Sequence, residues 1–145
     1  MQGMVREVSD KFGYGIKNIV PFKDAYMIET SQGQKLIKRV QISPGRLIFV
    51  HNAKEHLVNN GFTGVDRYLC TLSGDPYFAF DNCCYAVVDM IKGKESSFDD
   101  DNDLMRSASL LAGLHKASAG YLAPAGCKVK NELGKMPVYF RKRLD

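Results

Sequence analysis

The chain has 145 residues, of which 45% are hydrophobic and 25% charged, and its net charge is +4. This composition predicts a soluble globular chain with a real core, and no apolar run approaches the roughly 20 residues that span a bilayer. The basic excess is small and scattered, apart from residues 141–143, so a nucleic-acid partner is not expected. The four cysteines form no C-x-x-C pair and the first residues form no apolar signal segment, which favours a reduced, cytoplasmic chain.

The first half of the chain predicts a helix, an antiparallel meander and a second helix. In chain order, we expect a helix over residues 3–12, strands over 15–21, 25–30 and 35–40, and a helix over about 44–59. Ser43 is suited to the N-cap of the second helix and Pro44 to its first position, while Asn60 and Gly61 suit its end.

The second half predicts the rest of the sheet and a third helix. Strands are expected over residues 66–72, 76–80 and 83–91, followed by a helix from 103 to about 119. The strand over 83–91 is almost continuously apolar, which is typical of a central position. The fold class is therefore α+β, with an antiparallel sheet and flanking helices.

Lys38 is the first candidate functional residue. Side chains alternate along a strand, so Lys38 shares a face with Leu36 and Val40, while Lys35 and Arg39 point the other way. A lysine on an apolar face is costly unless an anion meets it. Kinase-like folds use a lysine of the third strand to contact ATP phosphates.

Glu55 is the candidate partner of this lysine. On the predicted helix it shares a face with Ile48, His51 and Val58, so it lies beside apolar residues. A carboxylate there could hold the Lys38 ammonium in place. The pattern leaves open the alternative that Lys38 is an ordinary strand lysine and Glu55 lies in water.

The strand over residues 83–91 ends in a short connector that could offer backbone groups to an adenine edge. A central strand and a plain loop remain the alternative interpretation. The turn over residues 21–25 contains no glycine, and neither a G-x-G-x-x-G loop nor a Walker A motif occurs, which weakens the ATP interpretation.

The sequence predicts no metal site. His51, His56 and His115 are scattered, and the acidic run over residues 99–103 has leucine where a calcium loop needs glycine and glutamate. That run is better explained as the start of a helix, where carboxylates are favourable.

Together these residues resemble the CotS-type spore-coat proteins, a branch of the aminoglycoside phosphotransferase and choline kinase-like superfamily. The matching stretches are residues 26–30 with Gly33, 36–40, 55–62, 85–93 and 126–135. The most specific match is the segment over residues 111–121, Leu-Ala-Gly-Leu-His-Lys-Ala-Ser-Ala-Gly-Tyr. The resemblance covers nearly the whole chain.

The resemblance implies a kinase-like N-lobe over residues 1–92, followed by a linker and the first helix of a truncated helical C-lobe over 93–145. It implies that Lys38 contacts ATP phosphates with Glu55 as its partner, although the helix register could place His51 or Asn52 there instead. It also implies that the connector residues Asp89, Met90 and Ile91 face adenine.

The superfamily's catalytic loop, with a His-Gly-Asp-like segment and a following Asn, and its metal-binding Asp are expected beyond residue 145. The chain then carries no catalytic residue of its own, and magnesium would bind only with the missing lobe supplied. The expected function is that of an N-terminal fragment of a kinase-like spore-coat protein that binds ATP. A non-catalytic coat-assembly scaffold, half of a split small-molecule phosphotransferase, and an unrelated α+β binding domain are the alternatives.

The family resemblance further implies other spore-coat proteins as partners, and the mother-cell cytoplasm and spore coat as locations. Exposed apolar residues around Leu111, Leu114 and Tyr139 predict self-association.

Overall fold

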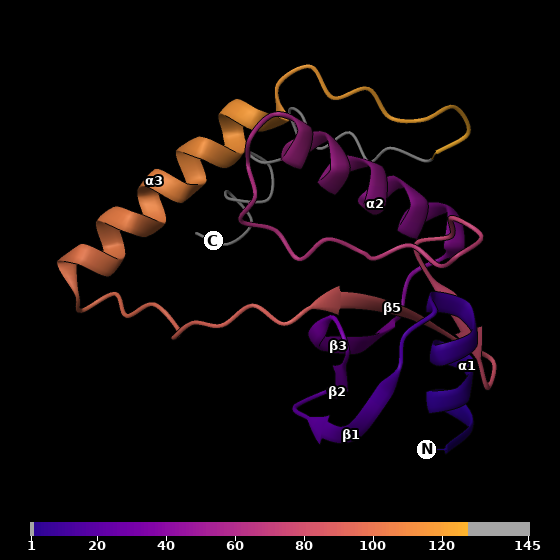
Figure 1. Ribbon diagram of the computed structural model, residues 1–145. Coiled ribbons are helices and arrows are strands. Elements are labelled where there is room, and N and C mark those ends of the chain that lie inside the picture. Colours follow the sequence, from indigo (N-terminus) through magenta and orange to yellow (C-terminus); the bar gives the residue numbers. More distant parts are fainter. Residues whose placement is uncertain (1, 128–145) are drawn as a thin grey trace, which may run out of the picture.

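The computed structural model describes residues 2–127 and has an α+β fold, as predicted (Figure 1). Its elements are α1 (Gln2–Phe12), β1 (Ile16–Phe22), β2 (Ala25–Thr30), β3 (Gly33–Val40), α2 (Pro44–Asn59), β4 (Phe78–Phe80), β5 (Cys83–Asp89) and α3 (Asp101–Ser118). The five strands form one antiparallel sheet in the order β1-β2-β3-β5-β4. No helix among the described residues is long and apolar enough to cross a membrane.

One face of the sheet packs against α1. The shared core consists of apolar side chains from the helix and from four strands: Met4, Val8, Phe12, Ile28, Ile37, Phe78 and Val87. The Phe12 and Phe78 rings meet edge to face, with their centroids 5.8 Å apart. This packing leaves the opposite face of β3 and β5, which carries Leu36, Lys38 and Val88, available to line a cavity.

Helix α2 begins and ends at the residues that the sequence predicted. The Ser43 side chain accepts a hydrogen bond from the backbone N–H of Arg46, as an N-cap does. At the other end Gly61 has φ +84°, and the N–H groups of Gly61 and Phe62 donate to the carbonyls of Val58 and Leu57. These two bonds form a Schellman motif, which needs a left-handed residue at the glycine position.

Helix α3 starts slightly earlier than predicted, because Asp100 is its N-cap and accepts hydrogen bonds from the N–H groups of Asn102 and Asp103. Helix α3 packs against α2. Tyr121, which follows α3, donates a hydrogen bond from its hydroxyl to the backbone carbonyl of Phe49 on α2. In Figure 1 a long connector runs from β5 to the start of α3, so that α2 and α3 lie together on one side of the sheet.

Three predicted strands are wrong in extent, and the one expected over residues 76–80 begins only at Phe78. The segment over residues 66–72 forms only one isolated bridge, between Leu69 and Val87. The same edge of β5 is occupied by β4 at residues 83–85, so the segment does not extend its pairing there. Strand β5 ends at Asp89 and not at Ile91, because Met90 makes the last backbone hydrogen bond to β3, from its N–H to the Gln34 carbonyl.

Candidate functional site

A cavity of about 280 Å³ opens on the face of the sheet that α1 does not cover. It is lined by the turn between β1 and β2, by β3, by the segment after α2 and by the end of β5. The lining residues are Phe22, Lys23, Leu36, Lys38, Asp66, Val88, Asp89, Met90, Ile91 and Gly93. Four of the five predicted site residues therefore meet here, Lys38 together with Asp89, Met90 and Ile91, whereas Glu55 does not line the cavity.

Lys38 lies on β3 directly between two alanines of the neighbouring strands, Ala25 on β2 and Ala86 on β5. Both alanines are buried, so the long lysine side chain can extend over them toward the cavity. Its ammonium is 3.0 Å from Oδ2 of Asp66, and 41% of the side chain remains exposed. An ammonium has three donors, and this pair uses one of them.

Asp66 also binds a second lysine, from α2. Lys54 Nζ is 2.6 Å from Oδ1 of Asp66 and 2.8 Å from its backbone carbonyl oxygen, and it lies 3.8 Å from the centre of the Tyr68 ring. Burial tends to raise the pKa of Asp66, but the hydrogen bonds and charges of Lys54 and Lys38 outweigh burial and lower it. The carboxylate is therefore ionised and shared between the two ammonium groups at neutral pH.

The expected pair between Lys38 and Glu55 does not form. Glu55 instead accepts two hydrogen bonds from Arg67, from Nε at 2.9 Å and from Nη2 at 2.6 Å. The Arg67 hydrogen bonds lower the pKa of Glu55 despite the opposing effect of burial. Of the alternative partners, Asn52 donates to the carbonyl of Ile48 one turn earlier, and neither it nor His51 is bonded to Lys38.

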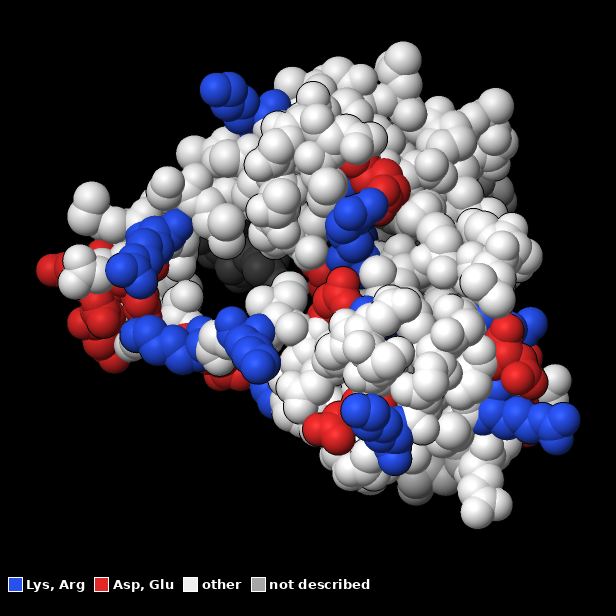
Figure 2. Space-filling view, in the orientation of Figure 1, with Lys and Arg blue, Asp and Glu red and all other residues white. Residues whose placement is uncertain are grey.

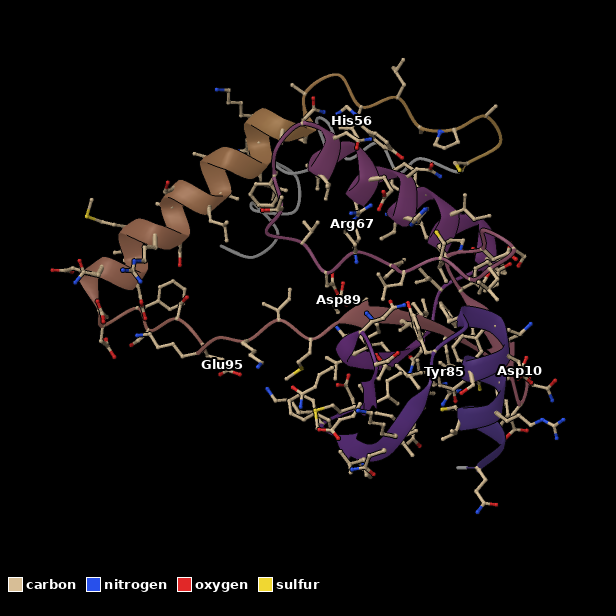
Figure 3. The ribbon with its side chains drawn as sticks, in the orientation of Figure 1. Asp10, His56, Arg67, Tyr85, Asp89 and Glu95 are labelled. Carbon is tan, nitrogen blue, oxygen red and sulfur yellow. The ribbon has the colours of Figure 1, made fainter. Side chains whose placement is uncertain are left out.

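Glu55 pairs with Arg67 and not with Lys38 because two consecutive charged residues on α2 match two consecutive charged residues on the segment that follows it. Lys54 and Glu55 follow one another on α2, and Asp66 and Arg67 follow one another on the segment after it. Each residue pairs with the opposite charge on the other segment. Figure 3 shows Arg67 on this segment beneath α2, and Figure 2 shows basic and acidic side chains gathered between the helix and the sheet.

The Asp89 side chain points away from the cavity, toward the α1 face. It accepts a hydrogen bond at 2.6 Å from Lys35, which is 4% exposed and has its ammonium 5.1 Å from the Tyr14 ring centre. Lys35 thus points away from Lys38, as the alternation of side chains along a strand predicted. Figure 3 places Asp89 at the end of β5. Its contribution to the cavity is consequently made by its backbone.

The orientation of that backbone follows from the register of β3 and β5. Lys35 and Asp89 are directly opposite, and Met90 N–H donates to the Gln34 carbonyl. This pattern makes Lys35 and Asp89 a non-hydrogen-bonded pair, so the N–H and C=O of Asp89 point away from β3. Val87, two residues earlier and oriented alike, accepts a hydrogen bond on that side from Leu69 N–H at 2.8 Å.

The turn between β1 and β2 is short. Phe22 and Ala25 are paired across it, so only Lys23 and Asp24 form the loop, and Lys23 adopts φ +52°. Two residues are too few to wrap several backbone amides around a phosphate, as a glycine-rich loop does. The turn offers instead the Lys23 ammonium, which is 3.3 Å from the exposed carboxylate of Glu95.

Asp66 and Lys54 are site residues that the sequence analysis did not identify. The signal available was the charge order, Lys-Glu on the helix and Asp-Arg with each residue twelve positions after its partner. That order indicates the pairs Lys54–Asp66 and Glu55–Arg67 only when the helix and the later segment are already known to lie side by side. Among residues 2–127 no group of three or more His, Cys, Asp or Glu side chains is placed to hold a metal ion.

No family model matches the chain. It is 30% identical over 118 residues to spore coat protein S of Bacillus subtilis, and the match covers 81% of this chain and 33% of that protein. Its fold matches the crystal structure of an aminoglycoside phosphotransferase from Alicyclobacillus acidocaldarius with a TM-score of 0.75 and 21% identity, over 94% of this chain and 40% of that one. The chain thus spans about a third of the curated relative's length. Its sequence is thus similar to that of spore coat protein S, and its fold is the kinase-like fold of the aminoglycoside phosphotransferase, as the sequence resemblance implied.

Proposed function

We propose that this chain is the nucleotide-binding N-lobe of a kinase-like spore-coat protein and that ATP occupies the 280 Å³ cavity. The observation that carries the proposal is the meeting of Lys38 with the connector after β5 around one cavity. A cationic side chain and an outward-facing backbone edge are the two features that a polyphosphate and a purine base require.

The adenine end of the site would lie against Leu36 and Val88, which form an apolar floor. The backbone N–H and C=O of Asp89 point out from the sheet edge beside them, as their register indicates. Met90 is a poorer ligand than the sequence predicted, because its N–H is already bonded to Gln34. Ile91, which is 63% exposed, remains a candidate for the outer wall.

The phosphate end would lie at Lys38. One of its three donors is engaged by Asp66, which leaves donors for a phosphate oxygen. Lys23 lines the same cavity and is a second cationic side chain there, paired with the exposed Glu95 carboxylate. Glu55 takes no direct part in this arrangement, since Arg67 occupies both of its oxygens.

The similarity to spore coat protein S supports a role in the coat, with other coat proteins as partners. The location in the mother-cell cytoplasm is part of the same proposal and rests on the sequence resemblance. The boundary between the lobe and the linker near residue 92 belongs to the same proposal. Phosphoryl transfer, and magnesium with it, would require the remaining two thirds of the relative's length in the same or another chain. A coat-assembly module is the second candidate function, favoured by the exposed apolar side chains on α3, which include Met105, Leu110 and Leu111.

Titration with ATP by calorimetry tests the proposal. The chain should bind, and Lys38→Met should weaken the affinity about tenfold or more, because a charge-assisted hydrogen bond to phosphate is lost. Lys17→Met is the matched control, since Lys17 is an exposed lysine on β1 that does not line the cavity. Equal affinity of wild type and Lys38→Met, or no binding by either, rules out the ATP site and leaves the assembly module.

A further inference from the structure

We propose that Asp66, fixed in place by Lys54, is the residue that positions Lys38, in the role that the sequence assigned to Glu55. The consequence for nucleotide affinity rests on the proposed ATP site, whereas the pairing itself can be measured without nucleotide. The two parts of the inference are therefore testable separately.

Asp66 is held more firmly than a surface carboxylate normally is. Lys54 bonds to both its side chain and its backbone carbonyl, at 2.6 and 2.8 Å, so one ammonium fixes the residue at two points. The Lys54 side chain is only 15% exposed, and the Tyr68 ring covers its ammonium. The second oxygen of Asp66 is thereby directed toward Lys38.

The positive charges of Lys38 and Lys54 require a carboxylate between them. Lys38 and Lys54 converge on one carboxylate, and without it two ammonium groups would face each other across the same space. Lys38 is 41% exposed, so water weakens its attraction to Asp66 and the pair contributes little to stability. Its main effect is directional, because it holds a flexible four-carbon side chain in one orientation.

Helix α2 takes part in this arrangement, although among the described residues Lys38 is paired with Asp66 and not with a helix residue. The Glu55–Arg67 pair holds the residue next to Asp66, so two consecutive ion pairs fasten the segment to two consecutive helix positions. A shift of α2 would move Asp66 and, through it, Lys38. Glu55 on the helix thus holds the segment in place through Arg67, and Asp66 on that segment holds Lys38.

Double-mutant cycles in urea unfolding test the pairing itself. Lys38→Met, Asp66→Asn and Glu55→Gln are measured singly and as pairs with Lys38→Met. Lys38 and Asp66 should be coupled by about two- to fivefold in the unfolding equilibrium constant, the range of an exposed ion pair. Lys38 and Glu55 should show no coupling. Coupling to Glu55 in place of Asp66 overturns the inference, whether or not nucleotide binds.

ATP titration of the same variants tests the positioning role. Asp66→Asn should weaken affinity about tenfold in the wild-type background and have no further effect in the Lys38→Met background, because Asp66 acts through Lys38. Asp66→Glu, which keeps the carboxylate, should recover most of the loss. An Asp66→Asn effect that persists without Lys38 would mean a merely structural role and overturn the positioning claim. No effect of Lys38→Met would instead overturn the ATP site, and the unfolding cycles would still decide the pairing.

Discussion

Lys35 and Lys38 lie on the same strand, yet their surroundings give them different roles. Lys38 is 41% exposed at the cavity, whereas Lys35 is 4% exposed on the other face of the sheet, beside the Tyr14 ring, and depends on Asp89 for its charge balance. A buried ammonium without a partner is strongly unfavourable. The Asp89 side chain therefore serves the stability of the sheet, and its backbone serves the cavity.

This division of roles predicts the effect of Asp89→Ala. The substitution should lower the free energy of unfolding by about 1–3 kcal/mol, because it leaves the buried Lys35 side chain without its carboxylate partner. ATP affinity of the folded protein should stay within about twofold, since the backbone groups remain. Urea unfolding and calorimetry measure the two effects, with Asp89→Asn as the control that keeps one hydrogen-bond acceptor. A loss of affinity with unchanged stability would contradict it.

At the scale of elements, helix α2 has ends that are encoded locally. Gly61 adopts φ +84° and a Cβ there would meet no atom within 4 Å, so only backbone strain opposes a side chain. Gly61→Ala should lower the free energy of unfolding by about 1 kcal/mol. Gly45→Ala, in the first turn of the same helix and equally unobstructed, should leave stability unchanged or raise it by up to about 1 kcal/mol. If urea unfolding showed that both substitutions change the free energy of unfolding equally, the end of the helix at Gly61 would not depend on the left-handed conformation of that glycine.

The same element shows how far the sequence could predict the site. The cap at Ser43, the stop at Gly61 and the alternation along β3 depend on neighbours in the chain, and the fold and the location of Lys38 followed from them. The partner of Lys38 is Asp66, which lies on the irregular segment that runs back beneath α2. Local sequence patterns do not predict the course of such a segment. The same return path explains why residues 66–72, which read as a strand, form only one bridge, at Leu69.

At the scale of the whole molecule, α3 presents apolar side chains that the described residues leave uncovered. Met105 is 73% exposed, and Leu110 and Leu111 are more than half exposed beside a cavity of about 330 Å³ that they share with Phe62. A surface of this kind favours association. Tyr139, which the sequence analysis placed in the same surface, lies outside the described residues.

The chain of 145 residues should therefore self-associate through α3. Light scattering should give a mass above that of the monomer, and the double substitution Met105→Lys and Leu111→Lys should return it to the monomer mass. Leu122→Lys is the control, because Leu122 is 87% exposed but lies beyond the helix. A monomer in the unaltered chain at high protein concentration would contradict the prediction.

The two-residue hairpin between β1 and β2 has a consequence for kinetics. With only Lys23 and Asp24 at its tip, this hairpin forms no flap that could fold over a bound triphosphate, and within residues 2–127 it would leave the outermost phosphate in contact with bulk water. Sequestration behind a closing loop is what usually slows ligand release. ATP bound here should leave rapidly, so that occupancy would follow the surrounding nucleotide concentration from moment to moment.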